Sequence, residues 1–86
     1  MPVKVQITKA DIRAGQGFLR GEPVPCPAVI ALERALCRSV AIGERVVLGE
    51  GPFGEETRPI PPALADWIVR FDAGLKPPPI TFDWPG

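Results

Sequence analysis

The sequence predicts a small α+β protein. It forms one domain, residues 1–86, with an antiparallel sheet of three or four strands and two helices on one face. Two observations support this class. Apolar and polar residues alternate near both ends of the chain, as in strands with one buried face. Two segments that begin with proline carry apolar residues at helical spacing. The length, with 45% hydrophobic and 23% charged residues, suits one domain with one core.

The first strand is predicted over residues 3–7, VKVQI, where apolar and polar residues alternate. Thr8 follows as a helix N-cap, because its hydroxyl can accept an early amide proton. Asp11 stands in the first turn, where a carboxylate is favourable. We expect this single turn to end at Gly15.

A loop is predicted over residues 16–25, which hold two glycines and two prolines. We expect Phe18 and Leu19 to anchor it in the core. The segment is long for so small a domain, and long ordered loops often carry function.

A helix is predicted to begin at Pro27, since proline suits the first helical position. Its apolar face comprises Val29, Ile30, Leu32, Leu36 and Cys37. Two β-rich runs follow at 39–42 and 45–48. Gly43 and Glu44 separate them, which favours a hairpin with a two-residue type II′ turn.

A second loop is predicted over residues 49–59, which are rich in glycine and polar residues, with Phe53 exposed in it. A helix then runs from Pro62 to a stop at Gly74. Asp66 and Arg70 face each other on its outer side. Its apolar face comprises Leu64, Trp67, Ile68, Phe71 and Leu75.

The last strand is predicted over residues 80–84, where Ile80, Phe82 and Trp84 alternate with polar residues. The resulting order, βαββαβ, is that of the ferredoxin-like split βαβ unit, with both helices on one face of a four-stranded sheet. The alternative is an irregular three-stranded antiparallel sheet with the last strand at its edge.

Charge is balanced overall but not along the chain. Residues 1–38 hold six basic and three acidic side chains, and residues 39–86 hold four basic and seven acidic ones. The zero net charge argues against a general binder of nucleic acid or anionic membrane, which draws affinity from excess Lys and Arg. No apolar run is long enough for a membrane span, and no signal-peptide pattern opens the chain. We therefore expect a cytoplasmic protein.

The residue types needed for catalysis are scarce. The chain has no histidine, which removes the usual general base and most zinc sites. Cys26 and Cys37 bracket one helix, too far apart for a disulfide. Cys26, at a helix N-terminus, is the one candidate for a reactive thiol, although core packing is the favoured interpretation. We predict no catalytic residue, no cofactor and no metal.

Two sequence patterns that would indicate nucleotide or RNA binding are incomplete in this chain. The glycines of residues 49–54 lack the Gly-Lys-Ser/Thr ending of a phosphate-binding loop, and acidic neighbours would repel phosphate. The six aromatic residues do not form the basic, aromatic-rich motif of RNA-binding sheets. We therefore expect no direct nucleic-acid binding.

Several short motifs give the chain a resemblance to a group of small uncharacterised proteins of bacteriophages and high-GC bacteria. The motifs are I-T-x-x-x-I-x-x-G at 7–15, C-P-x-x-x-A-L at 26–32 and W-I-x-x-F-D-A-G at 67–74. Pro79 to Phe82 resembles the closing P-F-x-F strand of the group. Members carry a second cysteine before the Cys-Pro, but Val24 and Pro25 stand here, so a metal site implied by the group fails on this chain.

The resemblance implies a mobile-element setting, in which small proteins bind and inhibit host complexes such as CRISPR effectors. In that hypothesis carboxylates face a basic groove of the host complex, with Phe53 as the apolar anchor. The predicted partner-binding residues are Glu44, Glu50, Phe53, Glu55 and Glu56. The alternative is a structural or regulatory protein that pairs with a second copy through the edge strand 80–84.

Overall fold

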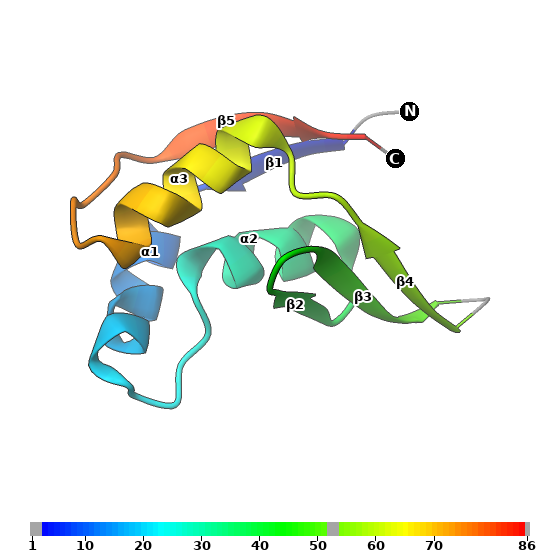
Figure 1. Ribbon diagram of the computed structural model, residues 1–86, viewed down its shortest axis with the longest axis horizontal. Helices are drawn as coiled ribbons and strands as arrows, with labels where there is room; N and C mark the ends of the chain where they lie inside the picture. The colour runs from blue at the N-terminus through cyan, green and yellow to red at the C-terminus, as the bar shows by residue number, and fades with distance from the viewer. Residues whose placement is uncertain (1–2, 52–53, 86) are drawn as a thin grey trace.

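The computed structural model describes residues 3–51 and 54–85. Figure 1 shows the arrangement of its helices and strands. In chain order they are β1 (Val3–Ile7), α1 (Lys9–Gly15), the 3-10 helix η1 (Gln16–Arg20), α2 (Pro27–Leu36), β2 (Val40–Ile42), β3 (Val46–Gly51), β4 (Gly54–Arg58), α3 (Pro62–Asp72) and β5 (Ile80–Trp84).

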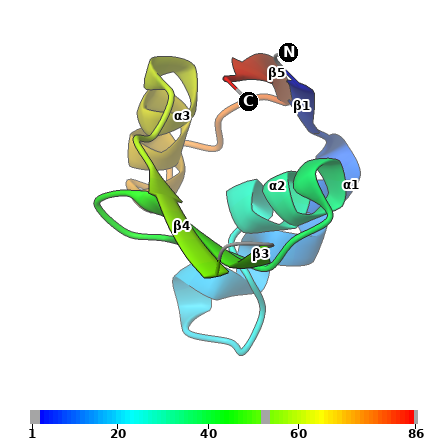
Figure 2. The same ribbon diagram turned by 90° about the vertical axis from the view of Figure 1, so that its right-hand side faces the viewer.

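The strands form two antiparallel sheets, one made of β1 and β5 and the other of β2, β3 and β4. This confirms the α+β class, but the single four-stranded sheet is wrong. The alternative of a three-stranded sheet with the last strand at its edge is also wrong, because β5 pairs with β1. α2 lies between the two sheets in both views (Figures 1 and 2).

The main cause of this difference is β4, which forms where a loop was predicted. Leu48 of β3 pairs with Glu56, and Val46 pairs with Arg58. Polar residues are tolerated because β4 is an edge strand, where charged side chains are common. Gly54 has a φ of 87°, which glycine adopts readily, and it pairs with Gly51 where the ladder turns. The register of the β3–β4 ladder is irregular between Leu48 and Gly51, within this glycine-rich stretch.

The loop between β2 and β3 also differs from the prediction. Ile42 pairs with Val46, so the connection has three residues, 43–45. Gly43 does not adopt the positive φ that a type II′ turn requires at its first position. The hairpin is confirmed, and its turn type was wrong.

β1 and β5 follow the predicted alternation and pair along their whole length, from Val3 with Trp84 to Ile7 with Ile80. Their buried side chains meet α2 and α3 in one core. That core comprises Val5, Ile7, Ala28, Ala31, Leu32, Val40, Val46, Leu48, Leu64, Trp67, Phe71, Phe82 and Trp84. The division into two sheets therefore does not divide the hydrophobic core.

The α1 N-terminus carries the predicted cap and an ion pair that the sequence did not reveal. The Thr8 hydroxyl accepts from the Asp11 amide, and the Asp11 carboxylate accepts from the Thr8 amide at 2.9 Å. The buried Asp11 also accepts two bonds from the Arg34 guanidinium of α2, each 2.7 Å long. The Arg34 guanidinium holds the Asp11 pKa at about 2, below its usual 3.8. Arg34 donates further to the Gln6 carbonyl, which ties α1, α2 and β1 together.

α3 begins and ends as predicted, at Pro62 and before Gly74, whose φ is 76°. The Trp67 and Phe71 rings stack with their centroids 5.2 Å apart, and the Trp67 indole N–H donates to the Pro78 carbonyl at 2.8 Å. Leu75 was predicted on the apolar face but is 69% exposed, because the helix has ended before it.

Candidate functional site

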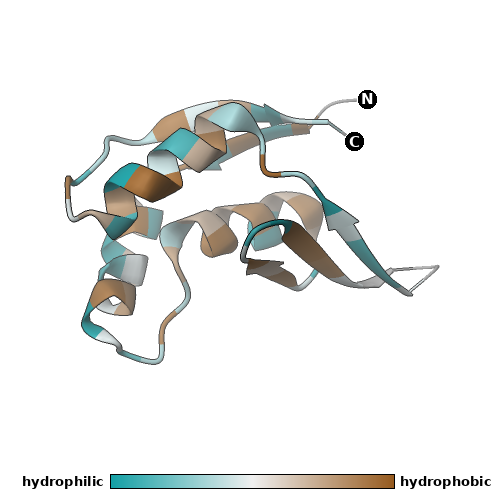
Figure 3. Ribbon diagram, viewed as in Figure 1, coloured by the Kyte–Doolittle hydropathy of each residue, from teal (hydrophilic) through white to brown (hydrophobic). Residues whose placement is uncertain are grey.

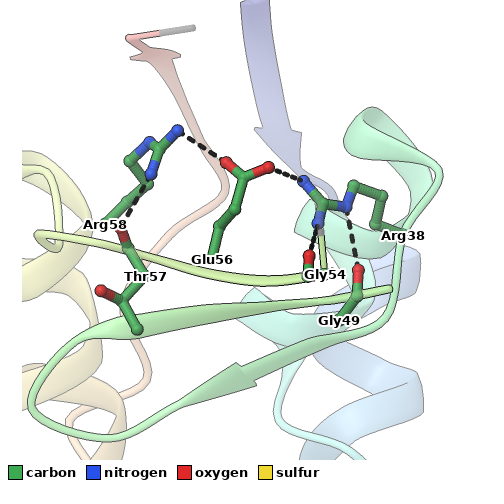
Figure 4. A network of polar contacts seen from close by, with 6 residues as sticks. All are labelled: Arg38, Gly49, Gly54, Glu56, Thr57 and Arg58. Atoms are coloured by element: carbon green, nitrogen blue, oxygen red, sulfur yellow. Dashed lines mark hydrogen bonds and ion pairs between the residues drawn. The ribbon is translucent and has the colours of Figure 1, made fainter. Parts of the chain in front are cut away.

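Of the carboxylates predicted to contact a partner, the three whose side chains the structure describes, Glu44, Glu55 and Glu56, differ in their surroundings. Glu56 lies opposite the buried Leu48, and directly paired residues share a face, so Glu56 points to the core side of the sheet. Its carboxylate accepts from Arg58 at 2.7 Å and from Arg38 at 3.4 Å (Figure 4). Arg38 also donates to the Gly49 carbonyl. Glu56 is therefore neutralised within the fold.

The other predicted partner-binding residues are separated. Glu44 is exposed in the loop between β2 and β3, and Glu55 is exposed near the start of β4. The backbone of Glu50 belongs to β3, whereas its side chain and all of Phe53 lie outside the described residues. Of the three predicted carboxylates that are described, Glu44 and Glu55 are exposed and Glu56 makes two ion pairs within the fold.

Cys26 lies at the start of α2, partly buried against the core. Burial raises the pKa of its thiol, and the Asp72 carboxylate adds to this effect. Amides of the first helical turn act in the opposite direction but contribute less. The arrangement disfavours the thiolate and supports a packing role for Cys26.

Along residues 3–51 and 54–85 there is no group of three or more Cys, Asp or Glu side chains that is placed to hold a metal ion. None of the helices in that part of the chain is long and apolar enough to cross a membrane.

The segment predicted as the loop 16–25 begins with η1, and its two large apolar residues do not enter the core. Phe18 is 45% exposed and Leu19 is 47% exposed. Figure 3 shows the hydrophobic residues on this turn, at the lower left of the molecule. Successive residues of a 3-10 helix point about 120° apart, so neighbours cannot both face one core. The predicted anchoring was therefore wrong.

Close local contacts set the position of η1. A Cβ on Gly15 would lie only 2.5 Å from Pro27 Cδ, so the absence of a side chain lets the end of α1 approach the start of α2. The Glu22 amide donates to the Gly17 carbonyl at 3.0 Å, closing the turn after η1. Gly21, with a φ of 76°, lies within that turn. Backbone contacts thus hold η1 although its apolar side chains stay exposed.

A groove of about 470 Å³ lies between η1 and the C-terminal end of α3. Ile12, Leu19, Phe71 and Pro77 form its apolar lining, and Arg20 and Lys76 also line it. A second groove of about 330 Å³ lies on the other side, lined by Phe18, Cys26, Ile68 and Asp72 among others. We name this region, residues 12, 18–20, 68, 71 and 74–77, the η1–α3 surface.

One sequence feature points to the η1 side of the η1–α3 surface. Phe18 and Leu19 stand together between a helix end and a segment rich in glycine and proline, which is the position of a surface turn. The α3 side of the groove gave none, because Phe71 and Pro77 are indistinguishable in sequence from core and connector residues.

No protein-family model, curated protein or solved structure matches this chain. The resemblance to small phage and high-GC bacterial proteins therefore stays a prediction.

Proposed function

We propose that this chain acts by binding another protein, with the η1–α3 surface as its contact site. The observation that supports this most is the pair Phe18 and Leu19, adjacent large apolar residues that are each nearly half exposed beside a groove. Single exposed apolar residues are ordinary, but apolar side chains gathered around grooves are typical of interaction sites.

Burial of apolar surface favours binding of a partner that covers both Phe18 and Leu19. Apolar surface removed from water stabilises a complex by about 25 cal/mol per Å², so covering the exposed parts of Phe18 and Leu19 contributes about 2 kcal/mol together. The groove walls add further area. Because close backbone contacts already hold η1, little ordering entropy is lost on binding.

A photo-crosslinking amino acid at position 19 tests this function. In extracts of a native host we expect a discrete crosslinked protein, which a crosslinker at the exposed Ala41 on the β2–β3–β4 sheet does not capture. The crosslink should also compete with unlabelled chain but not with a Phe18→Ser variant. Equal capture from positions 19 and 41 would contradict a contact site at η1.

Inhibition of a host complex, such as a CRISPR effector, is a narrower version of the same proposal. Support for an acidic contact is limited to Glu44 and Glu55, which are exposed. The test is co-purification with the purified complex, followed by Glu55→Lys. A charge reversal that leaves co-purification and inhibition unchanged would remove the acidic contact from the proposal.

Self-association through β5 is a second candidate. Within the described residues β5 pairs with β1 alone, so one of its edges carries no strand. Sedimentation velocity over a wide concentration range tests it. A dimer that a proline at Thr81 dissociates supports pairing through β5, and a monomer at high concentration excludes it.

A further inference from the structure

The groove between η1 and α3 has an uneven distribution of charge. Its floor is apolar, and its two charged lining residues, Arg20 and Lys76, are both cationic. No Asp or Glu lines it. The second groove differs, because Asp72 lines it. Of the two, only the first offers an apolar floor with cations alone.

Lys76 is the cation with the greatest freedom to meet a ligand. Among the residues that the structure describes it has no ion-pair partner, whereas Arg20 already pairs with Glu22 at 2.6 Å. Lys76 also has a φ of 52°, a left-handed conformation that is uncommon for lysine. Lys76 is therefore a cation beside the groove that has no ion-pair partner among the described residues.

α1 extends the positive charge along the groove. Ile12 and Gln16 line it from one helical face, and Lys9 lies three residues before Ile12 on that same face. Lys9 is exposed. A ligand that lies along the groove would therefore meet cationic side chains near both ends.

Resting on the protein-binding function proposed above, we infer that this groove binds an acidic amphipathic helix of the partner. Apolar residues of that helix, spaced i, i+3 and i+4, occupy the floor formed by Leu19 and Phe71, and its carboxylates face Lys76 and Arg20. This is the helix-in-groove mode of recognition, with charge complementarity choosing among helices.

Three synthetic helical peptides of about fifteen residues test the inference. They share one leucine-rich apolar face and carry Glu, Gln or Lys at all polar positions. Fluorescence anisotropy measures their affinity for the intact chain. Lys76 is the one lining cation without an ion-pair partner among the described residues, and an exposed charge pair contributes little, so we expect the Glu peptide to bind about threefold to tenfold more tightly than the Lys peptide. Amide chemical shifts should move at Ile12, Leu19 and Phe71.

Variants at Lys76 separate charge from folding. Lys76→Glu should abolish the preference for the Glu peptide over the Lys peptide, since Arg20 and Lys9 still offset the new carboxylate. Lys76→Gly should weaken the Glu peptide without lowering Tm, because glycine adopts the left-handed conformation readily. Arg45→Glu, an exposed cation in the β2–β3 loop, is the matched control and should change no affinity.

The outcomes distinguish this inference from the broader function. If all three peptides bind equally and Leu19→Ser abolishes binding, the charge preference is wrong while the apolar contact surface stands. If no peptide binds although position 19 still crosslinks a partner, the helix is wrong and protein binding stands. Leu19-dependent dimerisation, or Leu19-dependent binding to anionic phosphatidylserine vesicles without peptide binding, would also overturn the inference.

Discussion

In the β2–β3–β4 sheet Glu56 lies between Arg38 and Arg58, whereas at the η1–α3 surface Phe18 and Leu19 are left nearly half exposed. One long side chain is enough to neutralise a carboxylate. Two large apolar side chains can be covered only by a whole helix or strand packed over them. A domain of this size has few helices and strands available for that. Among the described residues, the exposed apolar side chains of η1 are therefore the place where we propose that a partner binds.

The largest expected effect comes from Gly15→Ala, which disturbs the placement of η1. The new Cβ would meet the Pro27 ring, a part of the chain that cannot move aside cheaply. We expect a loss of about 2–3 kcal/mol in the free energy of unfolding, measured by urea titration. Gly43→Ala, with nothing within 4 Å of its Cβ, is the control and should cost less than about 0.5 kcal/mol. Equal losses would show that contact with Pro27 does not fix η1.

Asp11→Asn removes the ion pair that joins α1, and so η1, to α2. A pKa lowered from 3.8 to about 2 corresponds to about 2 kcal/mol at neutral pH, and we expect a loss of that size. Because the folded pKa is depressed, this stability is present above the unfolded value of 3.8 and is lost as pH falls through about 2. Tm measured from pH 6 to pH 2 should show that loss in the native chain, and Asp11→Asn should lack this contribution.

Arg38→Met tests the sheet side of the comparison. The variant loses the bonds to the Gly49 carbonyl and the Glu56 carboxylate, and it keeps an apolar stem. We expect a loss of about 1–2 kcal/mol, with faster amide exchange confined to β3 and β4. Lys4→Met removes an exposed pair with Asp83 and should cost little. Unchanged exchange in β4 would show that Arg38 does not hold the hairpin.

Leu19→Ser has the smallest expected effect on folding. Its side chain is already nearly half exposed, so the free energy of unfolding should fall by less than about 1 kcal/mol. Leu64→Ala, at a fully buried position, should cost at least about 2 kcal/mol. Thermal denaturation of both variants measures the contrast. A comparable loss for Leu19→Ser would mean that Leu19 serves the core and not a partner.

The sequence predicted the elements whose patterns come from burial. β1, β5, α2 and α3 lie where alternation, helical spacing and proline placed them. β4 was missed because its residues are polar and flanked by glycine, so its stability comes from pairing with β3 and from Arg38. The division of the strands into two sheets was not predicted for the same reason. β4 was not foreseen, and it occupies one edge of β3.

The candidate surface was predictable only in part. Phe18 and Leu19 were recognised as notable but assigned to the core, because hydrophobic residues in a small domain are expected to be buried. Both lie on the 3-10 helix η1. No periodic pattern of apolar residues in the sequence predicts this short helix. Glu56 was taken as a free carboxylate because residues 49–59 were predicted as a loop: the strand β4 places Arg58, two residues on, on the same face as Glu56, and the other partner, Arg38, lies eighteen residues away in sequence.

The pairing of Val3 with Trp84 has a consequence for folding kinetics. Closing a loop of about 80 residues costs about 2 kcal/mol more in chain entropy than closing a hairpin of about ten. The β2–β3 hairpin and the helices are therefore expected to form before β1 meets β5, which makes this ladder a late step. Truncating Val5 to alanine should then accelerate unfolding far more than it slows refolding, a ratio that stopped-flow measurements give directly.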